Sequence, residues 1–235
     1  MFKQSSRSLN RAGAAAGVAA VVLLFAIFMI FPALPAPDEP AGAIAAAAQA
    51  DETSLLWGAY LGALMVIFLI TFGAAVAAAL KRAEGAEGGW WMLALAGIAA
   101  TSIGIVADAA VVTLVRAVGH GVTGQALWVG YGLDHWLGAL LALPLGLFVL
   151  AVSLGSRATG LLPRWLTWAG TVIGPALIVG AASITGDEVT GGALGVPLFL
   201  GYLLVLVWIV GTSVWLWCAA GQVRAAEPPS QEAVA

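Results

Sequence analysis

Residues 55–82 read LLWGAYLGALMVIFLITFGAAVAAALKR, an unbroken apolar run that ends in two basic residues. At a rise of ~1.5 Å per residue, a helix over this run is long enough to cross a hydrocarbon core of ~30 Å. The rest of the chain has the same character, because 62% of its 235 residues are hydrophobic and only 9% are charged. A soluble domain carries about 25% charged residues, so the composition predicts an integral membrane protein.

Six runs of this kind divide the sequence. We expect membrane spans at about residues 12–34, 54–80, 90–115, 125–152, 165–185 and 193–219. The predicted fold class is therefore all-α membrane, a bundle of six transmembrane helices. We interpret the first run as a retained helix, because the apolar stretch from Ala12 to Phe31 is longer than the ~7–15 residues of a signal peptide's apolar core.

The basic residues gather on one side of these spans. Eight of the nine Lys and Arg residues flank span ends that share one side: Lys3, Arg7, Arg11, Lys81, Arg82, Arg157, Arg164 and Arg224. Cytoplasmic segments carry such an excess of Lys and Arg, so the pattern predicts that both termini are cytoplasmic. Segment 1–11 then precedes the first span. Segment 220–235, which is polar and contains prolines, is expected to be a disordered cytoplasmic tail.

The external segment 36–53 differs in composition from the spans on either side. Four prolines between Pro32 and Pro40 cannot continue a helix and should end the first span. Residues 41–50 are mostly alanine, which is a strong helix former, and acidic residues flank them. We expect a short helix outside the hydrocarbon core, with a flexible external loop as the alternative.

Small residues recur at every fourth position within the spans, for example at Gly13 with Gly17 and at Gly170 with Gly174. Such residues let membrane helices approach closely, and we expect most of them to serve packing within the chain. Most tryptophans fall near span ends, where the ring suits the headgroup layer. Trp208 lies deeper in its span and is expected to pack inside the bundle.

Two acids and a histidine lie within the predicted spans: Asp108, Asp134 and His135. The third and fourth spans form a hairpin whose tip is near residue 121, and the two acids are equally far from this tip along the chain. Their carboxyl groups are therefore expected at one depth on adjacent antiparallel helices. If both were ionised they would repel, so one should hold a proton at neutral pH or His135 should supply the counter-charge.

This Asp/Asp/His cluster is the candidate site, and three further residues support it. Thr101 shares a helix face with Asp108. Tyr131 lies on the side of the fourth span that carries His135, and Arg116 is the one base on the predicted external side. Acids within a membrane are unfavourable and usually functional, which favours a proton site. Hydrogen bonds between membrane helices also serve as structural contacts, and this alternative stays open.

The sequence contains no pattern for a catalytic residue, a cofactor or a metal. A retinal Schiff base needs a lysine within a span, and the only lysines, Lys3 and Lys81, lie near span ends. A haem held by two histidines needs a partner for His135 at equal depth, but the only other histidine, His120, is at the hairpin tip. No HExxH zinc motif or glycine-rich nucleotide loop occurs. We expect no cofactor, no metal and no nucleic-acid partner, and we do not favour an enzyme.

The carboxyl half of the chain has a recognisable pattern. Residues 133–154 read LDHWLGALLALPLGLFVLAVSL, and the fifth span opens with Leu162-Pro163-Arg164-Trp165 and continues through Gly170 and Gly174-Pro175. Together with an acidic external segment and a second span that ends in Lys81-Arg82, this layout resembles the six-span bacterial membrane proteins grouped as domain of unknown function 4386. The resemblance implies a six-helix architecture in the bacterial cytoplasmic (inner) membrane. It implies no activity, because none is established for that family.

Three functional hypotheses follow from the sequence. The first is an accessory, structural or regulatory subunit, in which segment 36–53 or the spans contact a membrane-protein partner or a second copy of this chain. The second is a small proton-coupled transporter or channel that uses Asp108, Asp134 and His135. The third, an intramembrane enzyme acting on lipid or quinone, lacks a recognisable catalytic spacing. We rank them in this order, and the lipid bilayer is the partner common to all three.

Overall fold

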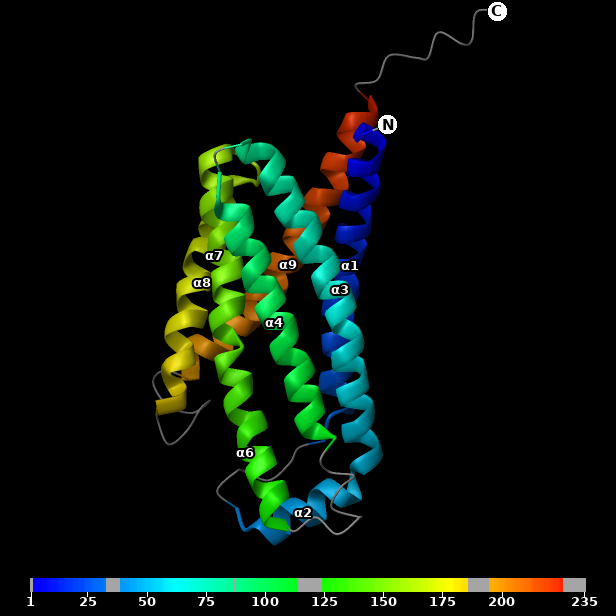
Figure 1. The fold of residues 1–235 in the computed structure, drawn as a ribbon, viewed down its shortest axis with the longest axis vertical. Helices are drawn as coiled ribbons and strands as arrows, with labels where there is room; N and C mark the ends of the chain where they lie inside the picture. Colours follow the sequence, from blue (N-terminus) through cyan, green and yellow to red (C-terminus); the bar gives the residue numbers. More distant parts are fainter. Residues whose placement is uncertain (1, 33–38, 87, 114–123, 186–194, 226–235) are drawn as a thin grey trace, which may run out of the picture.

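The computed structural model describes residues 2–32, 39–86, 88–113, 124–185 and 195–225. The regular structure in these ranges is entirely helical, and no strand occurs in them (Figure 1). The helices in chain order are α1 (Phe2–Ile30), α2 (Ala41–Ala50), α3 (Glu52–Glu84), α4 (Trp90–Val112), α6 (Gly124–Leu140), α7 (Ala142–Thr159), α8 (Arg164–Gly180), the 3-10 helix η1 (Ala181–Thr185) and α9 (Gly195–Ala225). The all-α class predicted from the sequence is confirmed.

Within the described ranges, six helical stretches are long and apolar enough to cross a membrane, which is the predicted number. They are Ser8–Ile30, Glu52–Glu84, Trp90–Val112, Val129–Thr159, Arg164–Ile184 and Gly195–Ala219. The chain ends differ from the expectation. Residues 2–11, expected to precede the first span, are helical and continuous with it, and α9 continues to Ala225 within the segment expected to be a disordered tail. The remainder of that tail, 226–235, lies outside the described residues.

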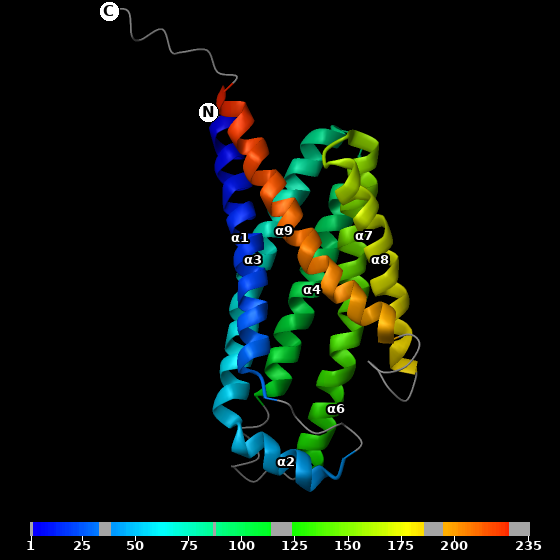
Figure 2. The same ribbon diagram turned by 180° about the vertical axis from the view of Figure 1, so that it is seen from behind.

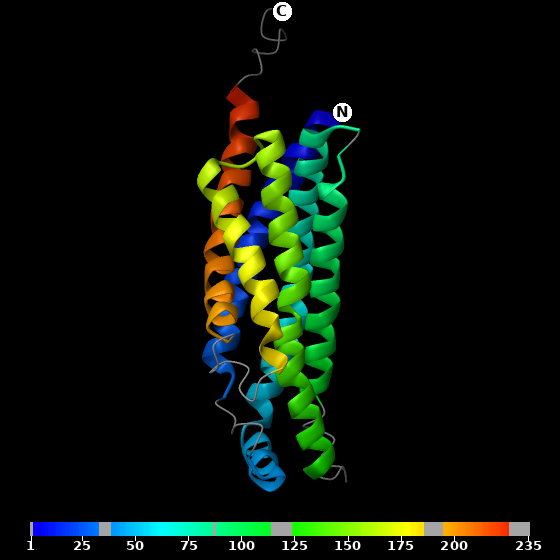
Figure 3. The ribbon, with the colours of Figure 1, turned by 90° about the vertical axis from the view of Figure 1, so that its left-hand side faces the viewer.

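The six spanning stretches form a closed ring in chain order. α1 packs on α3, α3 on α4, α4 on α7, α7 on α8, and α8 on α9, which returns to α1. The beginning of α1 and the end of α9 lie at one end of the bundle, and α2 lies across the other (Figures 1 and 3). We call these the terminal end and the α2 end.

Aromatic rings fill the centre of the ring of helices. Phe148 of α7 meets Phe72 of α3 and Trp208 of α9 edge to face, at centroid distances of 6.2 and 6.0 Å. Trp208 is 1% exposed, and its indole Nε1 donates to the carbonyl oxygen of Leu166 in α8 at 3.1 Å. The prediction that Trp208 packs inside the bundle is therefore confirmed.

Glycines set the closest contacts between helices. A Cβ atom added at Gly146 of α7 would lie 2.7 Å from the carbonyl oxygen of Gly174 in α8, and one added at Gly174 would lie 2.9 Å from the carbonyl oxygen of Gly146. At Gly17 of α1, an added Cβ would overlap Ser213 of α9. These positions leave no room for a side chain, so the predicted packing role of the small residues is confirmed here.

Basic side chains at the terminal end lie over tryptophan rings. The contacts are Arg11 on Trp217 at 5.8 Å, Lys81 on Trp91 at 4.4 Å and Arg157 on Trp168 at 4.3 Å from the ring centroid. Such contacts join a cation to an amphipathic ring, an arrangement suited to the headgroup layer of a membrane. The bases that the sequence assigns to one side of the membrane therefore share one end of the bundle at these three positions.

The fourth span is interrupted between α6 and α7. Pro144 has no N–H group and cannot donate to the carbonyl oxygen of Leu140, so one hydrogen bond of a continuous helix is missing. On either side of the break, Leu141 donates to Leu137 at 2.9 Å and Leu145 donates to Leu141 at 3.3 Å. The two halves contact different neighbours, because α7 packs on α4 and α8 whereas α6 packs on α4, α2 and η1.

The Ala-rich segment forms the helix α2, which covers the α2 end. Ile44 and Ala48 are 1% and 2% exposed, and Ala48 packs with Leu55 of α3 and with Phe31. The helix lies against α6 and α3 and leaves its other face exposed. The expected short helix is therefore present within segment 36–53, of which residues 36–38 lie outside the described part.

The separation between α1 and α9 widens from the terminal end toward α2 (Figure 2). α1 and α9 lie side by side at the terminal end and diverge toward the α2 end, where α9 begins well short of the level that α6 reaches (Figure 2). The divergence follows from the packing, because the close contact at Gly17 holds the two helices together on one side only. The candidate site lies in the wider half.

Candidate functional site

The two intramembrane acids come together between α4 and α6. Asp108 lies about one turn before the end of α4, and Asp134 lies within α6. Their carboxyl groups interact electrostatically and through a side-chain hydrogen bond. Both residues are half-buried, and both line one cavity. The structure thus brings together the two acids that are equally far from the hairpin tip.

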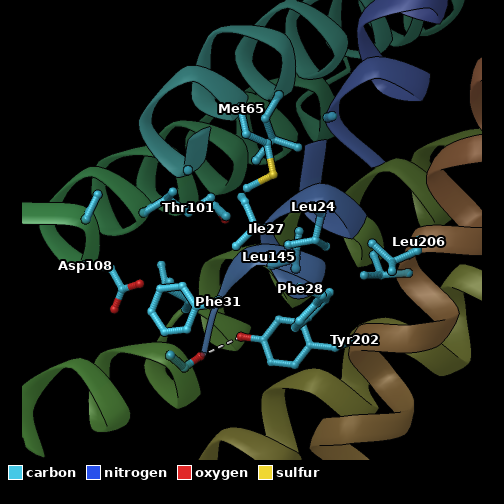
Figure 4. Close-up of a pocket in the computed structure, with 18 of the residues that line it drawn as sticks. Leu24, Ile27, Phe28, Phe31, Met65, Thr101, Asp108, Leu145, Tyr202 and Leu206 are labelled. Carbon is cyan, nitrogen blue, oxygen red and sulfur yellow. Dashed lines mark hydrogen bonds between the residues drawn. The ribbon is translucent and has the colours of Figure 1, made fainter. Parts of the chain in front are cut away.

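The geometry of the pair implies a shared proton. An ionised carboxylate accepts hydrogen bonds and cannot donate one, so a hydrogen bond between two carboxyl groups needs a proton on one of them. The Oδ1 atom of Asp108 is buried and has no hydrogen-bond partner among the described residues. Figure 4 shows the Asp108 carboxyl group pointing into the cavity. The pair can therefore hold a proton beside the cavity and still keep one oxygen of Asp108 that can accept a hydrogen bond.

Two of the three supporting residues lie close to this pair. Thr101 lies two turns from Asp108 on α4, is 2% exposed and lines the same cavity. Its hydroxyl donates to the carbonyl oxygen of Gly97 at 2.9 Å. Tyr131 of α6 is half-buried and near enough to Asp134 for an electrostatic interaction, but it is not part of the cavity wall.

The other two candidate residues cannot be placed in the site. His135 lies in α6, but its side chain falls outside the described part of the chain. Arg116 belongs to residues 114–123, which also fall outside it. The roles expected for these two side chains therefore stay predictions from the sequence.

Tyr202 of α9 is a site residue that the sequence reasoning missed. Its hydroxyl donates to the carbonyl oxygen of Gly138 in α6 at 2.6 Å, and the side chain lines the cavity within electrostatic reach of Asp108. Figure 4 shows the ring reaching into the cavity from α9 and the bond to α6 as a dashed line. A phenol within an otherwise apolar span was the available signal, but nothing in the sequence indicated its partner on α6.

The acids line a cavity of about 560 Å³ in the half of the bundle nearer α2. Six helices contribute to its wall, α1, α3, α4, α6, α7 and α9, and most of the wall consists of aliphatic and aromatic side chains. Gly62 of α3 and Gly138 of α6 belong to this wall, and a Cβ atom added at either would meet nothing within 4 Å. These glycines therefore enlarge the cavity. Its volume lies within the ~300–1,000 Å³ typical of small-molecule sites.

The cavity opens to the outer surface of the bundle between α1 and α9. Three residues both line the cavity and face outward: Phe28 of α1, 62% exposed, and Phe199 and Leu203 of α9, 57% and 45% exposed. These side chains form the mouth of the cavity. In a membrane, an apolar outer surface of this kind faces the hydrocarbon of the bilayer. The mouth would therefore open to lipid.

Phe31 separates the cavity from α2. It follows the end of α1, lines the cavity and, like Val112 of α4, packs against the buried cluster of Ala48 in α2 and Leu55 in α3. In Figure 4 its ring lies beside the Asp108 carboxyl group. The described residues therefore place an apolar cluster between the acid pair and the α2 end.

The described residues contain no group of three or more His, Cys, Asp and Glu side chains that could hold a metal ion. The site in this part of the chain is a carboxyl pair, two hydroxyl groups and an apolar cavity. This arrangement can hold a proton at the carboxyl pair and offers an apolar space beside it.

Comparisons with known proteins gave no match: no family model, no curated protein and no solved structure matches the chain. The resemblance to domain of unknown function 4386 is neither supported nor contradicted by them. The function must therefore be argued from the site itself.

Proposed function

We propose that this chain is a small membrane transporter that couples the movement of a bound molecule to protonation of Asp108 and Asp134. The observation that carries the proposal is the cavity that reaches both carboxyl groups. The sequence favoured an accessory subunit by default, because no motif in it indicated an activity. A cavity beside the pair favours a site at which a ligand and a proton meet.

The coupling follows from the energetics of a charge in an apolar space. An ionised carboxylate without a counter-charge is strongly unfavourable there. Two carboxyl groups that share protons reduce this penalty, and gain or loss of one proton changes the charge of the site by one. A ligand that binds one protonation state more tightly than the other is then linked to proton binding.

Flux through reconstituted protein tests this function. The purified full-length chain would be placed in liposomes that contain a pH-sensitive dye, and a pH gradient would be imposed with and without a panel of amphiphilic cations, anions and neutral solutes. We expect protein-dependent proton movement with at least one member of the panel. Asp108→Asn and Asp134→Asn should abolish this proton movement, because a side-chain amide neither binds nor releases a net proton at neutral pH.

The matched control is Asp51→Asn, which removes an exposed acid between α2 and α3. It should leave the flux unchanged. Proton movement no faster than in protein-free liposomes under every condition would contradict the proposal, as would equal flux in the wild type and the two Asn variants.

The proposed location is the bacterial cytoplasmic membrane, with both termini on the cytoplasmic side. The location rests on the resemblance to domain of unknown function 4386. The orientation is supported by the side chains of Arg11, Lys81 and Arg157, which lie at the terminal end against tryptophan rings. Cytoplasmic segments carry the excess of Lys and Arg.

An accessory or regulatory role is the second candidate, and the exposed face of α2 favours it. Next to α2, Trp57 and Tyr60 of α3 form an edge-to-face pair at 5.8 Å and are 56% and 58% exposed. Such rings suit a membrane interface or a second membrane protein. Cross-linking from a photoreactive residue in place of Tyr60 would test this role. A cross-linked protein of defined mass is expected only if a partner or a second copy binds there.

A further inference from the structure

We propose that the cavity binds an amphiphilic ammonium ion, a protonated amine on an apolar body, which enters from the bilayer between α1 and α9 and pairs with Asp108. The inference rests on the proposed transport function, since it names the substrate class of the same site. Three independent features support it: the position of the mouth, the direction of the hydrogen bonds in the wall and the charges that surround the acid pair.

The mouth selects a lipid-soluble molecule. Phe28, Phe199 and Leu203 are exposed on the outside of the bundle and also line the cavity. A ligand that passes between them travels from hydrocarbon into a wall that is largely aliphatic and aromatic. A small hydrophilic solute would lose its hydration without compensation on this route. The body of the ligand must therefore be apolar.

The hydrogen bonds of the wall select a ligand that donates. The Thr101 hydroxyl donates to Gly97, and the Tyr202 hydroxyl donates to Gly138, so both protons are already engaged with backbone carbonyl groups. Oδ1 of Asp108 is a buried acceptor without a hydrogen-bond partner among the described residues. An ammonium group has N–H donors and no acceptor, and it therefore complements this oxygen.

The charges of the wall select a cation. The described residues that line the cavity include two acids and no Lys, Arg or His. Among these described residues, a carboxylate or phosphate group on a ligand would meet acids and no base, whereas an ammonium group supplies a counter-charge for an ionised Asp108. A lipid with an ammonium headgroup also carries a phosphate, for which this wall offers no cation. The fitting ligand is therefore a free amphiphilic amine.

Binding of the ammonium ion displaces a proton. Before the cation enters, both carboxyl groups of the neutral pair are protonated. One carboxyl group then releases its proton to solvent, its O–H bond breaking, and pairs with the ammonium ion. The other carboxyl group keeps its proton and donates a hydrogen bond to the ionised one, so that the net charge of the site stays zero. The other titratable groups around Asp108 in the described residues are Asp134 and Tyr131 of α6 and Tyr202 of α9. The parts of α1, α3 and α7 that line the cavity contribute none.

Equilibrium binding to the full-length protein in phosphatidylcholine nanodiscs tests the ligand class without requiring transport. The probe is radiolabelled decylamine at pH 7, where it is a cation, and binding to empty nanodiscs is subtracted. We expect saturable binding at one site per chain and the release of about one proton per bound ammonium, since ligand and proton compete for one carboxyl group. Unlabelled decylamine should displace the probe. Decanol, decanoate and phosphatidylethanolamine should not.

Two variants test the contribution of the Asp108 carboxyl group and that of the cavity volume separately. Asp108→Asn should weaken binding at least tenfold. Gly62→Leu should abolish it, because Gly62 lines the cavity and its added side chain would project into the empty volume. The matched control is Gly132→Leu, since Gly132 also has open space at its Cβ position but is not part of the cavity wall. This control should bind as the wild type does.

Several outcomes would overturn the inference. Displacement by decanol or decanoate at the same concentration as decylamine would show that charge does not select the ligand, and displacement by phosphatidylethanolamine would point to a lipid headgroup. Equal binding in wild type, Asp108→Asn and Gly62→Leu would show adsorption to the bilayer only. For the route, Leu203→Trp narrows the mouth and should slow association at least threefold, whereas an unchanged rate would overturn passage between α1 and α9.

The two proposals fail separately. If decylamine binds as expected but no member of the solute panel moves protons in liposomes, the transport function is wrong and the site is a binding site for amines. If protons move with anionic or neutral members of the panel and decylamine does not bind, the transport function stands and the ligand class is wrong.

Discussion

The two hydroxyl groups of the site and the Asp108 carboxyl group differ in their hydrogen bonding. The Thr101 hydroxyl donates to a backbone carbonyl group within α4, whereas the Tyr202 hydroxyl joins α9 to α6. The Asp108 carboxyl group pairs with Asp134 and points into the cavity (Figure 4), and its buried Oδ1 atom has no hydrogen-bond partner among the described residues. Because a buried polar atom without a partner is unfavourable, a free oxygen beside an open cavity is a feature that a purely structural pair would not need.

Tyr202 provides a test of the contact between α9 and α6. Tyr202→Phe removes the hydrogen bond to Gly138 and leaves a carbonyl group without this donor, so we expect the free energy of unfolding to fall by about 1 kcal/mol. The matched control is Tyr60→Phe, whose hydroxyl is on an exposed residue of α3. Reversible unfolding in mixed micelles measures both. An equal change in the two variants would contradict the assigned role of the Tyr202 bond.

The sequence predicted the acid pair because the pair lies within one hairpin. Asp108 and Asp134 are equally far from the tip, and an antiparallel hairpin converts equal distance along the chain into equal depth. Tyr202 comes from α9, which is far from α6 in the sequence, and no spacing relates the two. The partner of a residue on a distant helix is decided by tertiary packing, and for this reason the bond to Gly138 could not be predicted.

At the scale of helices, the cavity exists because neighbouring elements pack closely in one place and separate in another. α7 and α8 meet at Gly146 and Gly174 with no space for a Cβ atom. α1 and α9 meet at Gly17 and Ser213 and then diverge (Figure 2). The glycine spacing predicted close contacts but could not indicate which partner each glycine meets, nor where two helices part.

Substitution at the contact between α7 and α8 measures how much that contact stabilises the bundle. Gly146→Ala places a Cβ atom against the Gly174 carbonyl oxygen, and overpacking of this kind costs about 1–3 kcal/mol. The control is Gly132→Ala in α6, where the added Cβ atom meets open space. This variant is expected to leave the stability of the protein unchanged or to raise it by up to about 1 kcal/mol, because alanine is the better helix former. Unfolding in mixed micelles compares the two. Equal free energies of unfolding for Gly146→Ala and Gly132→Ala would contradict the close contact between α7 and α8.

The break between α6 and α7 was visible in the sequence as Pro144, but its consequence was not. A proline removes one helix hydrogen bond wherever it occurs, and many membrane helices carry one without a cavity nearby. Here the break separates α7, which packs on α4 and α8, from α6, which reaches α2. The acid Asp134 and the acceptor Gly138 lie on the α6 side of the break, beside the cavity.

At the scale of the whole molecule, the sequence predicted the number of spans because the bilayer imposes length and polarity on each one separately. The part of the chain that the structure describes contains six helical stretches long and apolar enough to cross a membrane. Their closure into a ring, with α9 returning to α1, depends on side-chain packing between distant segments and could not be predicted. The cavity forms only where the six stretches close into this ring. The sequence therefore predicted the pair of acids but not the cavity beside it.

The ring of helices is predicted to lie in the membrane with its terminal end facing the cytoplasm. The terminal end carries Arg11, Lys81 and Arg157 against tryptophan rings, and the positive-inside rule places such an end in the cytoplasm. Single cysteines would report the two ends in intact bacterial cells treated with a membrane-impermeant maleimide. Ala86→Cys marks the exposed turn after α3 and Gln49→Cys marks the exposed face of α2.

Both reporters need a Cys218→Ser background, because Cys218 is an exposed free thiol among the described residues. We expect Gln49→Cys to be labelled in intact cells and Ala86→Cys to be labelled only after the membrane is opened. The physical reason is the free energy of moving a basic terminal end across the hydrocarbon core, which each Lys and Arg makes less favourable. Labelling of Ala86→Cys in intact cells, with Gln49→Cys protected, would reverse the orientation and would place the mouth between α1 and α9 in the cytoplasmic half of the bilayer.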